Sequence, residues 1–198
     1  MKKLLALAIA ILLAMSVNAQ KGSRYLGLSS ISFWGNNNIG TGFSYTKKGE
    51  TSTISYGISP EYGYFASDKF VLGLIVGFSG SKTEGQYQYY CYGCESSVVE
   101  EKFTFRFNPY ARCFLIQNGN FGLYLQSGFN LEWEGNSNKL GLFILPGVSY
   151  ALSSSFAATA SFGNLGFQVI SEPSYDVAYA VGLNLNMSTL NLGLSYTF

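Results

Sequence analysis

Histidine is absent from this sequence of 198 residues. This absence excludes Ser-His-acid triads, His-based proton transfer and the usual zinc and haem ligand sets. An enzyme built on this chain would need carboxylate, lysine or cysteine chemistry instead. We therefore predict a protein that is not an enzyme, with no catalytic residue, no bound metal and no cofactor.

Charge is also scarce, because Lys, Arg, Asp and Glu together make up 12% of the residues. The chain has 12 basic and 11 acidic residues, and two of the basic ones, Lys2 and Lys3, lie in an N-terminal segment that we expect to be removed. The remaining 10 basic and 11 acidic residues (12 − 2 against 11) leave a net charge near zero. Such a chain offers no basic surface for nucleic acid.

Long apolar runs are missing after the N-terminus. Lys2 and Lys3 precede an apolar run from Leu4 to Met15, and Val17-Asn18-Ala19 is the small-residue ending that signal peptidase cleaves. The run is shorter than the ~20 residues of a spanning helix, which disfavours the alternative of a transmembrane anchor. We predict a signal peptide over 1–19, cleaved after Ala19, and one domain over 20–198. If this domain spans a membrane, it must do so as strands.

Aromatic residues (17%) and 23 glycines are abundant, and this composition favours strands and tight turns. In the last nine residues, from Leu190 to Phe198, bulky apolar residues alternate with small polar ones. Side chains on a strand alternate faces with a period of two, so this segment is a strand with one apolar and one small polar face. The same alternation predicts strands within 24–34, 54–64, 70–79, 103–112, 121–132, 140–150, 156–167 and 183–198.

These segments predict an all-β fold, an eight-stranded antiparallel up-and-down transmembrane β-barrel with its bulky residues facing lipid. Ten strands are an alternative if Gly40 to Lys47 also pairs. The competing fold is a soluble barrel or sandwich, but its interior would have to hold more bulk than a narrow barrel can. We expect irregular register near Ser29-Ser30 and near Ser188-Thr189.

Several short motifs resemble a known family. They are Ser-Pro-Glu-Tyr-Gly-Tyr-Phe at 59–65, the turn Ser-Asp-Lys at 67–69 followed by Val-Leu-Gly-Leu at 71–74, and Gly-Leu-Ser-Tyr-Thr-Phe at 193–198. Together with the signal peptide they resemble the small outer-membrane β-barrel proteins of Bacteroidetes-type bacteria, which are similar in architecture to the OmpX and OmpA barrels. The resemblance implies an outer-membrane location, periplasmic termini, short periplasmic turns and longer extracellular loops.

The end of the chain resembles the closing strand of such barrels, in which a final aromatic residue is part of the signal read by the insertion machinery. Leu194, Tyr196 and Phe198 would form that signal. The resemblance further implies a monomer whose partners are outer-membrane lipid and lipopolysaccharide, and the barrel-insertion machinery during assembly.

Charged residues also occur on the small-residue faces that we assign to the lumen. They are Glu61, Arg106, Arg112 and Glu132, with Glu134 as a further candidate. An unpaired buried charge is costly, so we expect these residues to pair. The result would be a structural plug in a lumen that its own side chains fill. The alternative is an ion pathway, which would make the protein a narrow pore for small solutes.

Cys91 and Cys94 lie in the longest polar connection, from Lys82 to Glu101. A metal site would need two more ligands, and the chain has neither a second Cys pair nor a His. We predict a small disulfide in an external loop, with redox activity as the alternative. Cys113 shares the parity of the neighbouring outward-facing Phe residues, so we expect it to face lipid.

Function is then left to the loops, which we place at Gly35 to Thr51, Lys82 to Glu101 and Ile170 to Ala178. The second loop contains a tyrosine cluster, and tyrosine among small polar neighbours makes a good contact surface. We predict a structural or surface-interaction role, in adhesion or binding. The alternatives are the narrow pore and a lipid-binding or lipid-modifying barrel.

Overall fold

The computed structural model describes residues 21–31, 41–49, 51–88, 95–135, 137–171, 178–184 and 190–198. Within these ranges the chain forms strands of one sheet, joined by turns. The strands are β1 (Arg24–Ile31), β2 (Gly42–Lys48), β3 (Thr51–Ile58), β4 (Pro60–Ser67), β5 (Phe70–Gln88), β6 (Glu95–Asn118), β7 (Phe121–Glu134), β8 (Ser137–Ala151), β9 (Phe156–Ser161), β10 (Asn164–Ser171), β11 (Ala178–Asn184) and β12 (Asn191–Thr197). None of the described residues belongs to a helix long and apolar enough to cross a membrane.

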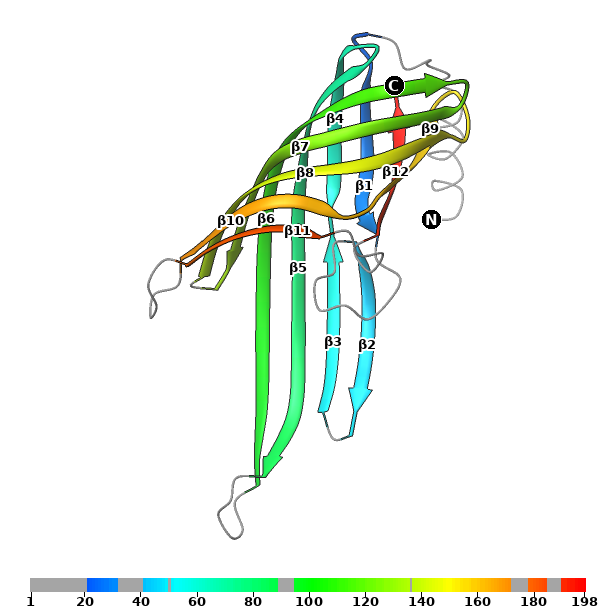
Figure 1. The fold of residues 1–198 in the computed structure, drawn as a ribbon. Helices are drawn as coiled ribbons and strands as arrows, with labels where there is room; N and C mark the ends of the chain where they lie inside the picture. The colour runs from blue at the N-terminus through cyan, green and yellow to red at the C-terminus, as the bar shows by residue number, and fades with distance from the viewer. Residues whose placement is uncertain are drawn as a thin grey trace, which may run out of the picture.

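The sheet closes into a ring of eight strands (Figure 1). Around the ring the order is β4, β5, β6, β7, β8, β9, β12 and β1, and the pairing of β1 with β4 completes it. Every neighbouring pair is antiparallel. β3 precedes β4 in one nearly continuous strand, and β10 follows β9 in the same way. The predicted all-β, eight-stranded antiparallel barrel is confirmed.

The ten-strand alternative required that the region from Gly40 to Lys47 also pair. β2 does pair, but it pairs with β3 and does not enter the ring. The register of β1 against β12 shifts between Leu28 and Ile31, where the sequence predicted an irregularity. The second predicted irregularity, near Ser188-Thr189, lies outside the described residues.

The outside of the barrel is apolar. Large exposed apolar residues, almost all of them aliphatic, form a band around its middle, including Leu26, Leu72, Leu125, Phe129, Leu142, Ile144, Leu165 and Leu194. Exposed aromatic residues border this band towards the turns, with Tyr64, Phe70, Phe121, Tyr150 and Phe198, and at the other end, with Phe43, Tyr56, Phe78, Phe103 and Trp133. An apolar band between two aromatic girdles is the exterior of a transmembrane β-barrel.

The band has the height of a bilayer. The outward face of β5 begins with Phe70, and its first charged residue is Lys82. These residues lie about 40 Å apart along a strand that rises ~3.4 Å per residue. At a strand tilt of ~40° this corresponds to about 30 Å along the barrel axis, which matches the hydrocarbon core.

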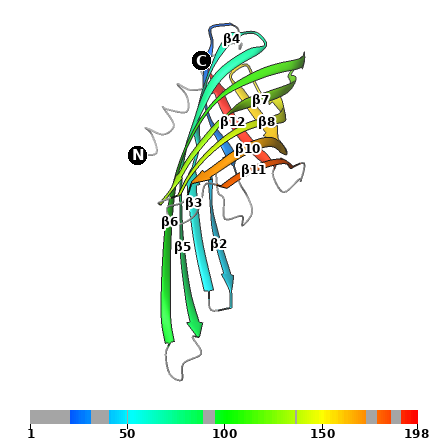
Figure 2. The same cartoon turned by 60° about the vertical axis from the view of Figure 1, so that its left-hand side comes forward.

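Four strands extend beyond the ring as a sheet, which Figures 1 and 2 show projecting well past the other strands. We call β2, β3, β5 from Ser79 onward and β6 up to Phe103 the extension sheet. The ladder between β5 and β6 runs without interruption from Phe70↔Cys113 to Gln88↔Glu95. Two predicted loops are therefore wrong in part. Most of Lys82 to Glu101 is strand, and Gly42 to Lys48, which falls within the predicted loop from Gly35 to Thr51, forms β2.

The chain end closes the barrel. The Phe198 amide donates to the Arg24 carbonyl at 2.8 Å, and the Arg24 amide donates to the Phe198 carbonyl at 3.0 Å. The Tyr196 ring lies 5.0 Å from that of Phe156 and 6.5 Å from that of Phe198. Leu194 faces outward opposite Leu28 of β1. The last strand therefore forms the seam with the first, at the same end as the short turns.

Candidate functional site

The lumen near the short turns is occupied by a buried ion pair. Arg112 of β6 donates from Nη2 to Oε1 of Glu61 on β4 at 2.9 Å. The same guanidinium donates from Nε and Nη2 to Oε1 of Gln126 on β7, at 3.0 and 2.8 Å. All three side chains are buried. The charged side chains of Glu61 and Arg112 can be buried because each of them has a charged or polar partner.

Three tyrosines surround this ion pair. The Arg112 Cζ lies 4.5 Å from the ring centre of Tyr124, 5.2 Å from that of Tyr110 and 6.0 Å from that of Tyr25. Tyr25 donates its hydroxyl to Oε1 of Glu61 at 2.8 Å. The Tyr110 hydroxyl, which has a single proton to donate, lies within hydrogen-bonding reach of both Glu61 and the Tyr25 hydroxyl. We call Tyr25, Glu61, Tyr110, Arg112, Tyr124 and Gln126 the tyrosine–arginine cluster.

Glycines on neighbouring strands make room for these rings. Tyr25 lies opposite Gly63, Tyr110 opposite Gly73 and Tyr124 opposite Gly147. A Cβ at any of these three glycines would overlap the tyrosine ring beside it. Each ring therefore lies across the backbone of the next strand, and the glycine is needed for that close approach.

Apolar packing closes the lumen beneath the cluster. Phe65 packs edge-on against Tyr25 and is stacked with Phe114, which in turn meets Tyr124 edge-on. Val71 completes this core and is fully buried. Aromatic side chains and the tyrosine–arginine cluster therefore occupy the same end of the barrel.

A second group of charges lies further from the turns. Arg106 Nε contacts Glu132 Oε2 at 2.8 Å, and Lys139 Nζ contacts Glu132 Oε1 at 2.7 Å and Glu134 Oε2 at 3.2 Å. We call these four residues the rim ion group. The structure thus places the four lumen charges named from the sequence in two separate groups, Glu61 with Arg112 and Arg106 with Glu132. Glu134 joins the second group through Lys139.

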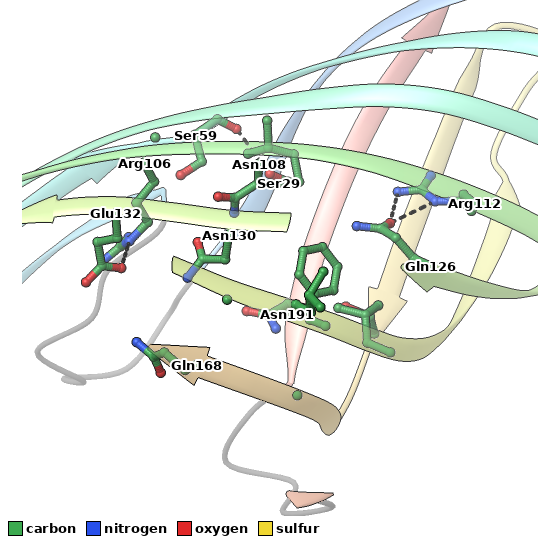
Figure 3. A pocket seen from close by; sticks show the side chains of 18 of the residues that line it. Ser29, Ser59, Arg106, Asn108, Arg112, Gln126, Asn130, Glu132, Gln168 and Asn191 are labelled. Atoms are coloured by element: carbon green, nitrogen blue, oxygen red, sulfur yellow. Dashed lines mark hydrogen bonds and ion pairs between the residues drawn. The ribbon is translucent and has the colours of Figure 1, made fainter. Parts of the chain in front are cut away.

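A cavity of about 510 Å³ lies between the two groups. Figure 3 shows that amide side chains from different strands project into it, among them Asn108, Gln126, Asn130, Gln168 and Asn191. Glycines line other parts of the wall, including Gly141, Gly166 and Gly182. We call this space the lumen cavity.

A second hollow of about 440 Å³ lies on the inner face of the extension sheet and shares Glu132 with the lumen cavity. Six of its lining residues are serines or threonines: Thr53, Ser55, Ser79, Ser81, Thr83 and Thr104. The hydroxyls of Thr53 and Thr83 lie 3.2 Å apart across neighbouring strands. We call this hollow the hydroxyl trough.

The extension sheet also carries solvent-exposed ion pairs, one of which, Lys102 with Glu100, lines the hydroxyl trough. Lys82 contacts Glu84 at 2.8 Å and Lys102 contacts Glu100 at 3.0 Å. The hydrogen bond from each lysine to its glutamate raises the pKa of that lysine. The pairs are solvent-exposed, so they contribute little to stability.

Other residues named from the sequence fall outside this arrangement. Cys91 and Cys94 lie outside the described residues, so the disulfide stays a prediction. Cys113 is exposed and forms no disulfide with any described residue, and its exposure is consistent with the expected position towards lipid. Sequence reasoning did not identify Tyr25, Tyr110 or Tyr124 as site residues. These tyrosines could have been identified from the sequence as large aromatic residues on strand faces whose other residues are small.

The described residues contain no group of three His, Cys, Asp or Glu side chains able to hold a metal ion. The chemistry that the lumen offers is hydrogen bonding and charge pairing. Its geometry can block a path and can hold a small polar molecule.

No family model and no curated protein matches the chain. Solved structures of similar fold include the N-terminal β-barrel domain of Pseudomonas aeruginosa OprF, with 14% identity, coverage of 90% of this chain and 99% of that one, and a TM-score of 0.46. The outer membrane protein OprG of the same bacterium has 12% identity, coverage of 91% and 98%, and a TM-score of 0.48. The Escherichia coli Outer Membrane Protein W has 12% identity, coverage of 91% and 100%, and a TM-score of 0.43. Similarities of this size carry no inference about role, and the Bacteroidetes-type resemblance stays a prediction.

Proposed function

We propose that the protein resides in the bacterial outer membrane as a closed, non-conducting barrel and acts at the cell surface through its extension sheet. The observation that supports this most directly is the exterior, an apolar band of bilayer height that covers the ring and the base of the extension sheet, whose strands project further (Figure 1). Lipid and lipopolysaccharide would surround the band. We further propose that the protein is a monomer and that its signal peptide, which lies outside the described residues, is removed after Ala19. Leu194, Tyr196 and Phe198 would form the insertion signal.

The first test concerns location. We expect the protein in the outer-membrane fraction of a density gradient, with a gel mobility that changes on boiling, because a closed hydrogen-bonded barrel resists unfolding by detergent until it is heated. Recovery in the soluble fraction, or a mobility that boiling does not change, would contradict the proposed location.

The second test concerns the blocked lumen. We expect purified protein in planar bilayers to show no steady current, because aromatic residues and the buried Glu61–Arg112 pair fill the end near the turns. A water-filled porin serves as the positive control for the same bilayers. Steady conductance on the nanosiemens scale would instead support the narrow-pore alternative.

The third test concerns the extension sheet as an interaction surface. Its edges are available for contact, since within the described residues β2 pairs only with β3. Unpaired strand edges and exposed aromatic residues such as Phe43 and Tyr45 are features of surfaces that bind other proteins.

Replacing residues 83–100 with Asn-Gly would join Lys82 to Glu101, which are already cross-strand partners, through a tight hairpin turn. We expect this variant to remain in the outer membrane with wild-type heat modifiability. Adhesion of expressing cells to protein-coated surfaces should fall to the level of cells without the protein. Unchanged adhesion by a variant that is inserted at the wild-type level would show that the outer part of the sheet is not the contact surface.

A further inference from the structure

The lumen cavity is walled off from the turn end and has the size of a ligand pocket. Its volume of about 510 Å³ falls within the ~300–1,000 Å³ typical of small-molecule sites. The tyrosine–arginine cluster forms its floor, with Tyr124, Gln126 and Arg112 among its lining residues. Phe143 and Leu145 add an apolar surface next to that floor.

The charges around the cavity balance. Arg106, Arg112 and Lys139 supply three positive charges, and Glu61, Glu132 and Glu134 supply three negative ones. Each positive group contacts a negative group at 3.2 Å or less. A charged ligand would have to break one of these pairs and leave its partner exposed to a poorly solvated interior, whereas a neutral ligand would not.

The trough adds one further balanced pair, Lys102 with Glu100, and the other polar groups left to contact a ligand are amides and hydroxyls. Each amide both donates and accepts hydrogen bonds, and so does each hydroxyl of the adjoining trough. The Asn108 Oδ1 is buried and has no hydrogen-bond partner among the described residues, so turning this amide towards a ligand breaks no bond to that oxygen. A ligand that fits carries several groups that are donors and acceptors at once.

From this pattern we infer that the lumen cavity and the hydroxyl trough bind a neutral saccharide chain. Sugar hydroxyls match the amides and hydroxyls of the walls, and the C–H face of a sugar ring matches the apolar surface of Phe143. The trough continues the cavity along the extension sheet, so the site accommodates more than one sugar ring. The proposed outer-membrane location determines only the side of the membrane from which the saccharide enters the cavity. The binding itself does not depend on that location.

One glycine allows a direct test of the cavity. Gly182 of β11 lines it, between Val181 and Leu183, whose side chains are largely exposed. A Cβ at Gly182 would meet no atom within 4 Å. Gly182→Leu therefore projects a side chain into the cavity without straining the barrel. Ser127→Leu is the matched control, because Ser127 is exposed on the outer surface of β7 and the same side chain there faces lipid.

The experiment is calorimetric titration of the purified, detergent-folded protein with neutral tetrasaccharides of glucose, mannose and N-acetylglucosamine, and with an acidic galacturonate tetrasaccharide. We expect at least one neutral saccharide to bind and the acidic one to bind more weakly. Gly182→Leu should weaken binding roughly tenfold or more, and Ser127→Leu should leave it unchanged. A parallel titration uses neutral polysaccharide released from the native outer membrane. Binding of this polysaccharide would indicate a ligand from the same cell, and binding of the free tetrasaccharides alone would indicate a soluble ligand.

A second pair of variants covers the case in which Gly182→Leu fails to fold, as judged by its gel mobility. Gln168→Ala removes an amide that lines the cavity, and Gln117→Ala removes one at the turn end, where its Nε2 donates to the Asp68 carbonyl. We expect only the first to weaken binding. The inference is overturned if no neutral saccharide binds at millimolar concentration, if the acidic one binds more tightly, or if binding is insensitive to both cavity variants. Because these measurements use detergent-folded protein, they are independent of the outcome of the location test.

Discussion

Arg112→Met is expected to lower the free energy of unfolding by ~3–5 kcal/mol, the range found when one partner of a buried ion pair is removed. Methionine keeps much of the side-chain volume but leaves the Glu61 carboxylate without the guanidinium 2.9 Å away. It also leaves Gln126 Oε1 without both of the hydrogen bonds that Arg112 donates to it. Three tyrosine rings would lose the cation that they surround. The measurement is urea unfolding of the barrel in lipid vesicles, followed by tryptophan fluorescence.

The control for this variant is Lys82→Met. Lys82 forms an ion pair of similar length, 2.8 Å to Glu84, but its side chain is 43% exposed. Exposed pairs contribute ~0–1 kcal/mol, so this variant should unfold almost like the wild type. Glu61→Gln combined with Arg112→Met removes both charges and should regain part of the loss. Similar costs for Arg112→Met and Lys82→Met would contradict the view that this ion pair is a buried structural element.

The architecture was predictable because a lipid exterior imposes a strict pattern. Side chains at even positions from Ile54 to Tyr64 face outward, and Ser55, Ser59 and Glu61 are buried inside, as the period of two requires. Once the bulky face is assigned to lipid, the number and direction of the strands follow from the positions of the turns. One of these turns is at Asn118-Gly119, where Gly119 has the positive φ of 57° that favours glycine.

Of the extension sheet, β3 falls largely within the predicted strand 54–64 and β2 was expected to pair only in the ten-strand alternative, but the strands within 82–101 were missed for the same reason. Beyond the bilayer both faces of a strand meet water, so the alternation that marks a membrane strand disappears, and Lys82 to Glu101 has the composition of a loop. The clue was the β-branched residues on either side of its tip, such as Thr83, Val98 and Val99, because these residues favour strands. The tyrosine–arginine cluster was not predictable as a unit. Its contacts join residues as far apart as Tyr25 and Tyr110, and they depend on the register of strands that are not adjacent in the sequence.

Gly73→Ala is expected to destabilise the barrel by ~1–3 kcal/mol, the usual cost of overpacking a filled interior. The added Cβ would overlap the ring of Tyr110, which lies directly opposite on β6. The ring cannot move without leaving the hydroxyl of Tyr25 and the carboxylate of Glu61. Gly182→Ala is the matched control, because it adds the same methyl group to an inward-facing glycine with open space around it.

A double-mutant cycle separates this steric effect from a general intolerance of Gly73 to substitution. Tyr110→Ala alone should be costly, at about 3–5 kcal/mol for loss of a large buried aromatic side chain. Once the ring is gone, the methyl group at residue 73 has nothing to overlap, so Gly73→Ala should add almost no further cost in that background. The two changes should therefore be coupled by ~1–3 kcal/mol in unfolding experiments. Strictly additive costs would show that Gly73 is required for the backbone of β5 itself and not to accommodate the ring of Tyr110. The same cycle can be run for Gly63 with Tyr25 and for Gly147 with Tyr124, which have the same cross-strand geometry.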